Sequence, residues 1–469
     1  MSAALVEERA AAEGTEGRIR IILAASLGAA LNPLNSTMIA VALPALSADF
    51  HASAASVTLT VVTGYLVATL VSQVPAGNIA DRVGYGRALA WGRWLFLAGA
   101  LAGAFAPALW AVVAGRLVMA AGGSLILPTA MALVRVSVPA ERRQRAFGAM
   151  AAVLGGAAAI GPAIGAWMTA HVGWRSLFLI NVPILAGSYL LQPADGLVDR
   201  AEAPGVRHPF DWTGNAMIGI ALTLLTFATR SAVPMAYAIA AGGVIALVVL
   251  VLHERRTADP VLKLDLFANR GFMMASGVIA LQNLAMYALL IQVPFLFGGS
   301  SAAEQSRLGL AIIAMTGTMA VSAPAAGWLA EWLGATPVVA IGGLVGAAGV
   351  FGIARLPVSA LPLDVGVRLL LVGLGLGLST GSSQAVALTS APASRSAVAS
   401  ATMSMLRYLG AIGGTVILGY AFAGTNSVAR QHVALALFAG AFMASTMLAL
   451  AFPALPLLRR ARINSRTVR

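Results

Sequence analysis

Long apolar runs dominate the chain, and they limit what it can fold into. A helix that crosses a membrane needs roughly 20 mostly apolar residues. Only 10% of the residues are charged, against about 25% in a typical soluble protein. The sequence therefore predicts an all-α membrane protein with fourteen transmembrane helices. These lie near residues 20–43, 55–76, 88–107, 110–134, 146–170, 175–192, 212–229, 235–252, 271–298, 306–330, 336–355, 365–389, 398–422 and 433–456.

The runs fall into groups of six, two and six, separated by two longer polar segments. These segments read LQPADGLVDRAEAPGVRHPFD and HERRTADPVLKLDLFANR. The spacing predicts two six-helix bundles, residues 20–192 and 271–456. A linker with two extra transmembrane helices, residues 193–270, joins them. An N-terminal tail, residues 1–19, and a basic C-terminal tail, residues 457–469, complete the chain.

The loop charges predict how the chain is oriented in the membrane. With fourteen spans both termini lie on one side, and the segments on that side hold 22 basic residues against six on the other. Cytoplasmic loops are the ones enriched in lysine and arginine. We therefore expect both termini to be cytoplasmic, in a multi-pass protein of the inner (plasma) membrane.

The composition excludes several classes of function. The chain has no cysteine, which rules out disulfides, zinc–thiolate sites and iron–sulfur clusters. The five histidines lie between apolar runs or at their ends, so we expect neither a metal site nor a cofactor. The basic residues behind the net charge of +13 are scattered singly, which does not indicate a nucleic-acid partner. The sequence contains no phosphate loop and no Ser-His-Asp set, so it does not indicate an enzyme.

Two turns with the same spacing suggest an internal repeat. GNIADRVGYGR, after the second run, contains Gly77, Asp81 and Gly84. GWLAEWLGATP, after the second run of the last group, has an acid, Glu331, at the same place between two glycines. Internal repeats of this kind are common in secondary transporters.

These motifs resemble the major facilitator superfamily, specifically its fourteen-helix drug:proton antiporter branch, over residues 18–457. GNIADRVGYGRAL is similar to the loop signature of the superfamily, with Tyr85 and Gly86 where basic residues are usual. Arg116 matches the arginine of the fourth-helix signature. The phrases WRSLFLINVP, FDWTG and DPVLKLDLFANRGF resemble connecting segments of that branch. The fifth span matches the antiporter signature at Gly148, Gly161, Pro162 and Gly165.

The resemblance implies a role for each motif. Asp81, next to Arg82 in a short turn, is expected to accept hydrogen bonds from the N-terminus of a neighbouring helix, where the helix dipole favours negative charge. This contact would act as a conformational latch; the alternative is a solvated topology signal. The small residues of the fifth span permit close helix packing, and the resemblance adds a gating role.

Polar residues within the spans are the candidates for a substrate cavity. An arginine inside a span usually faces a partner or water, which favours a cavity position for Arg116 over snorkelling to the surface. Arg407 either faces the cavity or packs against carbonyl groups of a broken helix. The remaining uncharged candidates are Asn32, Asn35, Gln73, Gln282, Asn283, Tyr287, Gln292 and Gln384. Each alone could instead join two helices.

The first span lacks the acid that the antiporter branch usually carries. In LNPLNSTMIAVALP, Asn35 stands at that position, and a carboxamide cannot titrate. All seventeen acidic residues map to tails, loops or span ends. A carboxylate proton relay in the central cavity, a usual device in such proteins, therefore has no obvious carrier.

The resemblance implies a monomeric transporter that exports small amphiphilic compounds or drugs by alternating access, with protons as a coupling partner. Because the acid is missing, a second hypothesis remains: the protein is an exporter or facilitator of an anionic metabolite, without proton coupling through the central cavity. A lipid flippase is a further alternative.

Overall fold

The structure is a computed structural model of the 469-residue chain. It describes residues 3–52, 57–192, 211–228, 233–257, 260, 263–297, 302–357, 360–422 and 427–452. The predicted C-terminal tail, 457–469, and residues 193–210 of the first polar segment lie outside these residues.

All regular structure in the described residues is helical. The first part of the chain contains α1 (Ala3–Asp49), the π-helix η1 (Thr58–Thr63), α3 (Gly64–Val83), α4 (Tyr85–Ala104), α5 (Leu109–Ser137), the 3-10 turn η2 (Ala140–Arg142), α6 (Arg143–His171), α7 (Ser176–Leu179) and α8 (Asn181–Leu190). Next come α9 (Trp212–Ala228), α10 (Val233–Glu254) and α11 (Leu264–Ala268). The last part contains α12 (Arg270–Phe297), α13 (Ala302–Leu333), α14 (Ala335–Ala354), α15 (Pro362–Ser390), η4 (Ala393–Arg395), α16 (Ser396–Phe422) and α17 (Ser427–Leu450).

A helical element lies at each of the fourteen predicted spans. Eight described segments are long and apolar enough to cross a membrane by length and composition. They are Arg20–Ile39, Thr60–Val83, Leu109–Ser137, Arg270–Leu290, Ala311–Leu333, Ala335–Ala354, Leu363–Ser390 and Ala429–Leu450. The count of fourteen transmembrane helices stays a prediction.

Most helix ends differ from the predicted ones by a few residues, and two differences are larger. Residues 3–19, predicted as a tail, continue α1 as helix. The predicted span 175–192 is divided into α7 and α8 at Ile180. Pro183 lies in the first turn of α8 and has no N–H group, so it cannot donate the bond that would continue α7.

The internal repeat is visible in the backbone. A single glycine joins α3 to α4, Gly84 with φ 89°, and a single glycine joins α13 to α14, Gly334 with φ 87°. A residue with a side chain disfavours positive φ, which explains why the connecting residue is a glycine in both turns. A proline and a 3-10 turn follow α5 at Pro139 and recur after α15 at Pro392.

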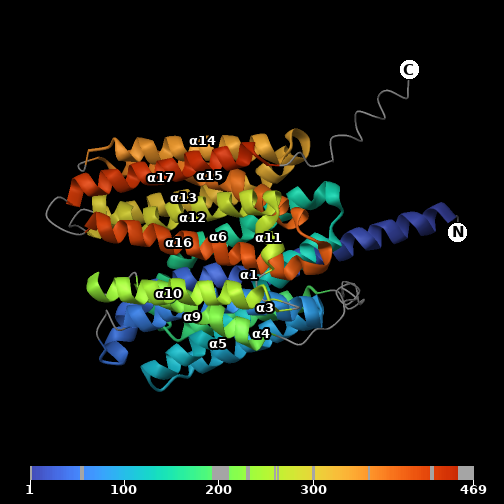
Figure 1. The fold of residues 1–469 in the computed structure, drawn as a ribbon, viewed down its shortest axis with the longest axis horizontal. Helices are drawn as coiled ribbons and strands as arrows, with labels where there is room; N and C mark the ends of the chain where they lie inside the picture. The colour runs from blue at the N-terminus through green and yellow to red at the C-terminus, as the bar shows by residue number, and fades with distance from the viewer. Residues whose placement is uncertain are drawn as a thin grey trace.

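Helices α1 to α8, the first half, and α12 to α17, the second half, lie side by side with their axes roughly parallel (Figure 1). Across the boundary between the halves, α6 packs on α13 and α15, and α3 packs on α16. The helices α9 and α10 pack on each other, and α9 also packs on α3. An apolar cluster that includes Leu70, Ile218, Leu250 and Met405 joins α3, α9, α10 and α16.

Four of the exposed tryptophans lie towards the ends of the helix bundle, where an aromatic belt would meet the membrane surface. Trp110 begins α5 and Trp167 is near the end of α6, at one end of the molecule. Trp328 and Trp332, whose rings are 5.6 Å apart, occupy the last turns of α13 at the other end. This distribution fits helices that cross a bilayer.

Candidate functional site

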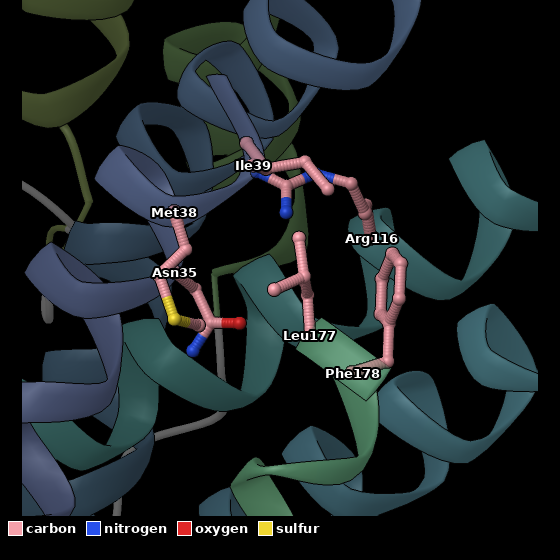
Figure 2. A pocket seen from close by; sticks show the side chains of 6 residues that line it. All are labelled: Asn35, Met38, Ile39, Arg116, Leu177 and Phe178. Atoms are coloured by element: carbon pink, nitrogen blue, oxygen red, sulfur yellow. The ribbon is translucent and has the colours of Figure 1, made fainter. Parts of the chain in front are cut away.

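A small pocket lies inside the first half, between α1, α5 and α7 (Figure 2). It is lined by Asn35, Met38, Ile39, Arg116, Leu177 and Phe178. The guanidinium of Arg116 reaches across towards Ile39, and Leu177 lies between it and Asn35 (Figure 2). The space does not hold even a water molecule, so a solute can enter only after the surrounding helices move.

Asn35 faces a second carboxamide rather than a charged group. Its Nδ2 donates to Oδ1 of Asn181 at 2.6 Å, and Nδ2 of Asn181 donates back to Oδ1 of Asn35 at 3.2 Å. Asn181 begins α8 and is fully buried, and Asn35 is 3% exposed. The same Nδ2 atoms also donate to backbone carbonyls, of Leu31 for Asn35 and of Phe178 for Asn181. The two amides therefore join α1 to α8 without any titratable group.

Arg116 is held by the π-helix η1 and by an aromatic ring. Its Nε donates to the carbonyl oxygen of Val61 at 2.7 Å. A π-helix interrupts the regular hydrogen-bond pattern of a helix, and Val61 lies within η1. The guanidinium carbon lies 4.2 Å from the ring centroid of Tyr65. Such a contact is a cation–π interaction, which strengthens when it is desolvated.

Asn32 continues this network into α5. The hydroxyl of Tyr65 donates to Oδ1 of Asn32 at 2.8 Å, and Nδ2 of Asn32 donates to the carbonyl oxygen of Gly123 at 3.1 Å. A Cβ at Gly123 would lie 2.2 Å from Oδ1 of Asn32. The glycine therefore leaves the space that Asn32 occupies, and three helices of the first half are connected through polar side chains.

One terminal nitrogen of Arg116, Nη2, has no hydrogen-bond partner in the described part of the chain. The residue is 1% exposed, and no ion pair joins it to a described carboxylate. A buried guanidinium with a free N–H group is suited to a carboxylate or phosphate oxygen.

Asp81 joins the two halves at the end opposite to this pocket. Its Oδ1 and Oδ2 accept hydrogen bonds from the backbone N–H groups of Ala397 and Val398, at 3.0 and 2.9 Å. These N–H groups belong to the first turn of α16, where helix N–H groups lack partners within the helix. The hydroxyl of Tyr85 donates to the same carboxylate at 2.9 Å.

Arg135, near the end of α5, strengthens this junction. Its Nη1 donates to the carbonyl oxygen of Pro392 at 3.1 Å and to Oγ of Ser396 at 2.8 Å, and its Nη2 donates to the carbonyl oxygen of Ala391. Arg145 of α6 also forms an ion pair with Glu331 of α13. The second acid of the repeat therefore contacts the first half in this conformation.

Glycines allow the helices to approach closely at the same end. A Cβ at Gly77 would lie 2.6 Å from Cβ of Ala401, across the contact between α3 and α16. A Cβ at Gly148 would lie 2.6 Å from the carbonyl oxygen of Ala323, across α6 and α13. Gly161 and Gly165 instead pack against α1, next to Thr37 and Met38. The side chain of Pro162 is not among those that the structure describes.

At the opposite end a contact within the first half links the end of α1 to the turn before α7. Arg175 donates to Oδ2 of Asp49 at 2.9 Å, and Nε1 of Trp174 donates to the same oxygen at 3.1 Å. The hydrogen bond from Arg175, assisted by that from Trp174, holds the pKa of Asp49 below its usual value.

The candidates of the second half do not form one cluster. Gln282 donates to Oγ of Ser445 at 3.2 Å and Gln292 to the carbonyl oxygen of Gln431 at 2.8 Å, so both join α12 to α17. Asn283 donates to the backbone one turn earlier, at Ile279.

Tyr287 and Arg407 are nearer to the first half. Tyr287 of α12 and Tyr408 of α16 interact electrostatically with each other and with Tyr65 of α3, in the first half. Arg407 is half-buried, with its guanidinium carbon 5.4 Å from the ring centroid of Tyr408.

Sequence reasoning missed two buried residues. Asn181 stands in the phrase WRSLFLINVP but was not among the candidates, and only the fold brings it to Asn35. Arg93 was not among the candidates either, although it lies in α4 and is 5% exposed. Its Nη2 donates to Oγ of Ser188 at 2.9 Å. The predicted start of that helix at residue 88 leaves Arg93 inside the span, which was the available signal.

These features define a helical membrane protein with polar and charged groups buried between its helices, in two repeated halves. The sequence model of the Major Facilitator Superfamily matches residues 25–415. The chain therefore belongs to the Major Facilitator Superfamily, a family of transporters and not of enzymes.

Comparison with individual proteins agrees. The MFS-type transporter YvkA of Bacillus subtilis is 30% identical over 400 residues, which cover 85% of this chain and 89% of YvkA. The tetracenomycin C resistance and export protein of Streptomyces glaucescens is 28% identical over 417 residues, covering 87% of this chain and 77% of that protein. The crystal structure of the human organic anion transporter MFSD10 superposes with a TM-score of 0.68 at 16% identity, over 92% of this chain and 99% of that chain. This last likeness concerns the fold.

Proposed function

We propose that this transporter exports a small amphiphilic compound across the inner membrane by alternating access, driven by proton antiport. The similarity to an antibiotic export protein supports the direction. The junction of Asp81 with the first turn of α16 is the structural observation that supports the proposal. It joins the two halves at this end through hydrogen bonds, which can break when the halves separate.

The proposed orientation places both termini, and therefore the Asp81 end, in the cytoplasm. In this orientation the conformation is closed towards the cytoplasm. The transporter works as a monomer in the bilayer, since each half supplies one side of the passage.

Proton coupling requires a group that gains and loses a proton, and the pocket beside Arg116 does not supply one. Asn35 and Asn181 occupy its α1 side, and neither carboxamide titrates. Asp81 is the candidate proton carrier outside the pocket. A proton bound to its carboxylate would compete with the backbone N–H groups of α16 that donate to it.

The test is transport in proteoliposomes with and without an imposed pH gradient, using a panel of fluorescent amphiphilic compounds. We expect uphill export only when the gradient is imposed. Asn35→Asp places a carboxylate between Asn181 and the Arg116 pocket and is expected to make export more steeply dependent on pH. Accumulation of no compound under any gradient would refute export, and uphill export that ignores the gradient would refute antiport.

A second candidate function is favoured by the free Nη2 of Arg116. In this reading the solute is an anionic metabolite that supplies the missing oxygen partner, and it is exported without proton coupling through the cavity. The negative charge of the solute then takes the place of the carboxylate that the first span lacks at Asn35.

A further inference from the structure

Three buried polar side chains near the Asp81 end have hydrogen-bonding atoms without a partner in the described residues. Both amide atoms of Gln73, on α3, are unpaired, and so is Oγ of Ser404, on α16. Oε1 of Gln384, on α15, is likewise unpaired. Gln73 and Ser404 are fully buried and Gln384 is 2% exposed. We call these three side chains the polar layer.

The three side chains share helix faces with close contacts between the halves. Gln73 precedes Gly77 by four residues and Ser404 follows Ala401 by three, and Gly77 and Ala401 lie in direct contact. Residues three or four apart lie on one face of a helix, so Gln73 and Ser404 both face the boundary between α3 and α16.

Gln384 occupies the corresponding place on α15. It follows Gly381 by three residues, and a Cβ at Gly381 would lie 2.8 Å from Cα of Gly148 on α6. Gln384 therefore faces the first half as well. Gln73 lies about 12 Å from Asp81 along α3, since the two positions are eight residues apart on one helix. It lies between the Asp81 junction and the Arg116 pocket.

A buried polar atom without a partner destabilises the state in which it is buried, and apolar side chains would pack there without that penalty. The arrangement makes physical sense if the same atoms face water in another state. The second state must separate α3 from α16 and α15 from α6, which is the opening that breaks the Asp81 junction.

We propose that Gln73, Ser404 and Gln384 form an uncharged hydrogen-bonding surface that is dry when the Asp81 end is closed and lines the water-filled passage when that end opens. In the open state these side chains bind water and meet the uncharged polar groups of a solute before it reaches Arg116. This inference rests on the alternating access of the proposed function. The unpaired atoms also oppose the junction made by Asp81 and Arg135, so that the closed state can be left.

The chain has no cysteine, so single cysteines can be labelled in the full-length protein without other changes. Ser404→Cys is expected to react slowly with N-ethylmaleimide in the otherwise unchanged chain, and at least tenfold faster when Asp81→Asn weakens the junction. The control is Ser445→Cys. Ser445 is fully buried but joins α12 to α17 within the second half, and its labelling rate is expected to stay the same in both backgrounds.

A second variant tests the role of the unpaired atoms. Gln73→Met keeps the side-chain length and removes both polar atoms, so it is expected to favour the closed state and to slow labelling of Ser404→Cys in the Asp81→Asn background. An unchanged rate would overturn this role of Gln73.

Slow labelling of Ser404→Cys in the Asp81→Asn background would overturn the proposed surface, provided that the distance between spin labels at Arg87→Cys and Ser394→Cys shows that the halves have separated. Failure of the export function would appear separately, as absence of transport by the unchanged protein in proteoliposomes.

Discussion

At the scale of single residues, the pairing of carboxamides around Asn35 decides what the pocket can do. Two amides satisfy each other as donor and acceptor, so neither Asn35 nor Asn181 needs a charge nearby. Arg116 is left with Val61 and Tyr65 as neutral partners and with one free terminal nitrogen. The positive charge of the pocket is therefore uncompensated by the described residues, which favours a solute that brings a negative charge.

This argument predicts the effect of removing the arginine. Arg116→Ala is expected to reduce transport of a carboxylate-bearing solute by tenfold or more, because hydrogen bonds to a charged group contribute about 1.5–3 kcal/mol. Arg116→Lys is expected to restore part of the activity, since lysine keeps the charge but not the planar donor set. Initial rates in proteoliposomes provide the measurement.

The exposed Arg355, at the end of α14, is the matched control. Arg355→Ala is expected to leave transport unchanged. If Arg116→Ala transports the anionic solute at the original rate, Arg116 has a structural role only, and the anionic reading fails.

At the scale of helices, the boundary between the halves depends on residues without side chains. Gly77 brings α3 against α16, and Gly148 brings α6 against α13. Small residues at such contacts allow backbones to approach closely. A helix pair of this kind is sensitive to a single added methyl group, because the nearest atoms across it belong to backbone or to Cβ positions that cannot turn away.

Gly77→Ala is accordingly expected to separate the halves at the Asp81 end. The added Cβ would lie 2.6 Å from Cβ of Ala401, and overpacking of a packed interior destabilises it by about 1–3 kcal/mol. Distances between spin labels at Arg87→Cys and Ser394→Cys measure the separation. Gly64→Ala, on the same helix with nothing within 4 Å of its added Cβ, is expected to show the original distance. Equal distances in the two variants would contradict the close contact.

At the scale of the whole molecule, the two repeats make unequal contributions to the closed end. Asp81 accepts two backbone hydrogen bonds from the opposite half, whereas Glu331 meets Arg145, through one backbone hydrogen bond and a side chain that is half exposed. An exposed ion pair contributes little and is screened by salt. The repeat is similar in sequence and backbone, but its two acids have different partners in this conformation.

Asp81→Asn is therefore expected to shift the equilibrium towards the open state by about tenfold, since an amide nitrogen cannot accept from Ala397 or Val398. Glu331→Gln is expected to have a much smaller effect, and one that disappears at high ionic strength. The same pair of spin labels measures both. A larger opening in Glu331→Gln than in Asp81→Asn would contradict this order.

Much of the fold could be predicted from the sequence. Apolar runs mark helices because a backbone in lipid must satisfy its own hydrogen bonds, and each predicted span does contain helix. The turns at Gly84 and Gly334 were recognisable from spacing alone, because few residues tolerate their positive φ. The split between α7 and α8 was missed, although Pro183 was its signal.

The candidate site could be predicted only in part. Asn32, Asn35 and Arg116 were found because polar groups in apolar runs are conspicuous in any sequence. Their partners were not, since the carbonyl of Val61 that meets Arg116 carries no mark in the sequence. For Asp81 a helix N-terminus was predicted as the partner, but the sequence did not show that it belongs to α16.

By itself, the sequence determined that this is a helical membrane protein whose first predicted span, residues 20–43, carries no acid, because composition and the order of apolar runs are properties of the chain alone. Only the tertiary structure decided that Asn35 pairs with Asn181, that Arg116 keeps a free nitrogen, and that Gln73 is buried without partners. Those facts depend on which helices meet, and residues 146 positions apart, such as Asn35 and Asn181, come together only when the helices pack.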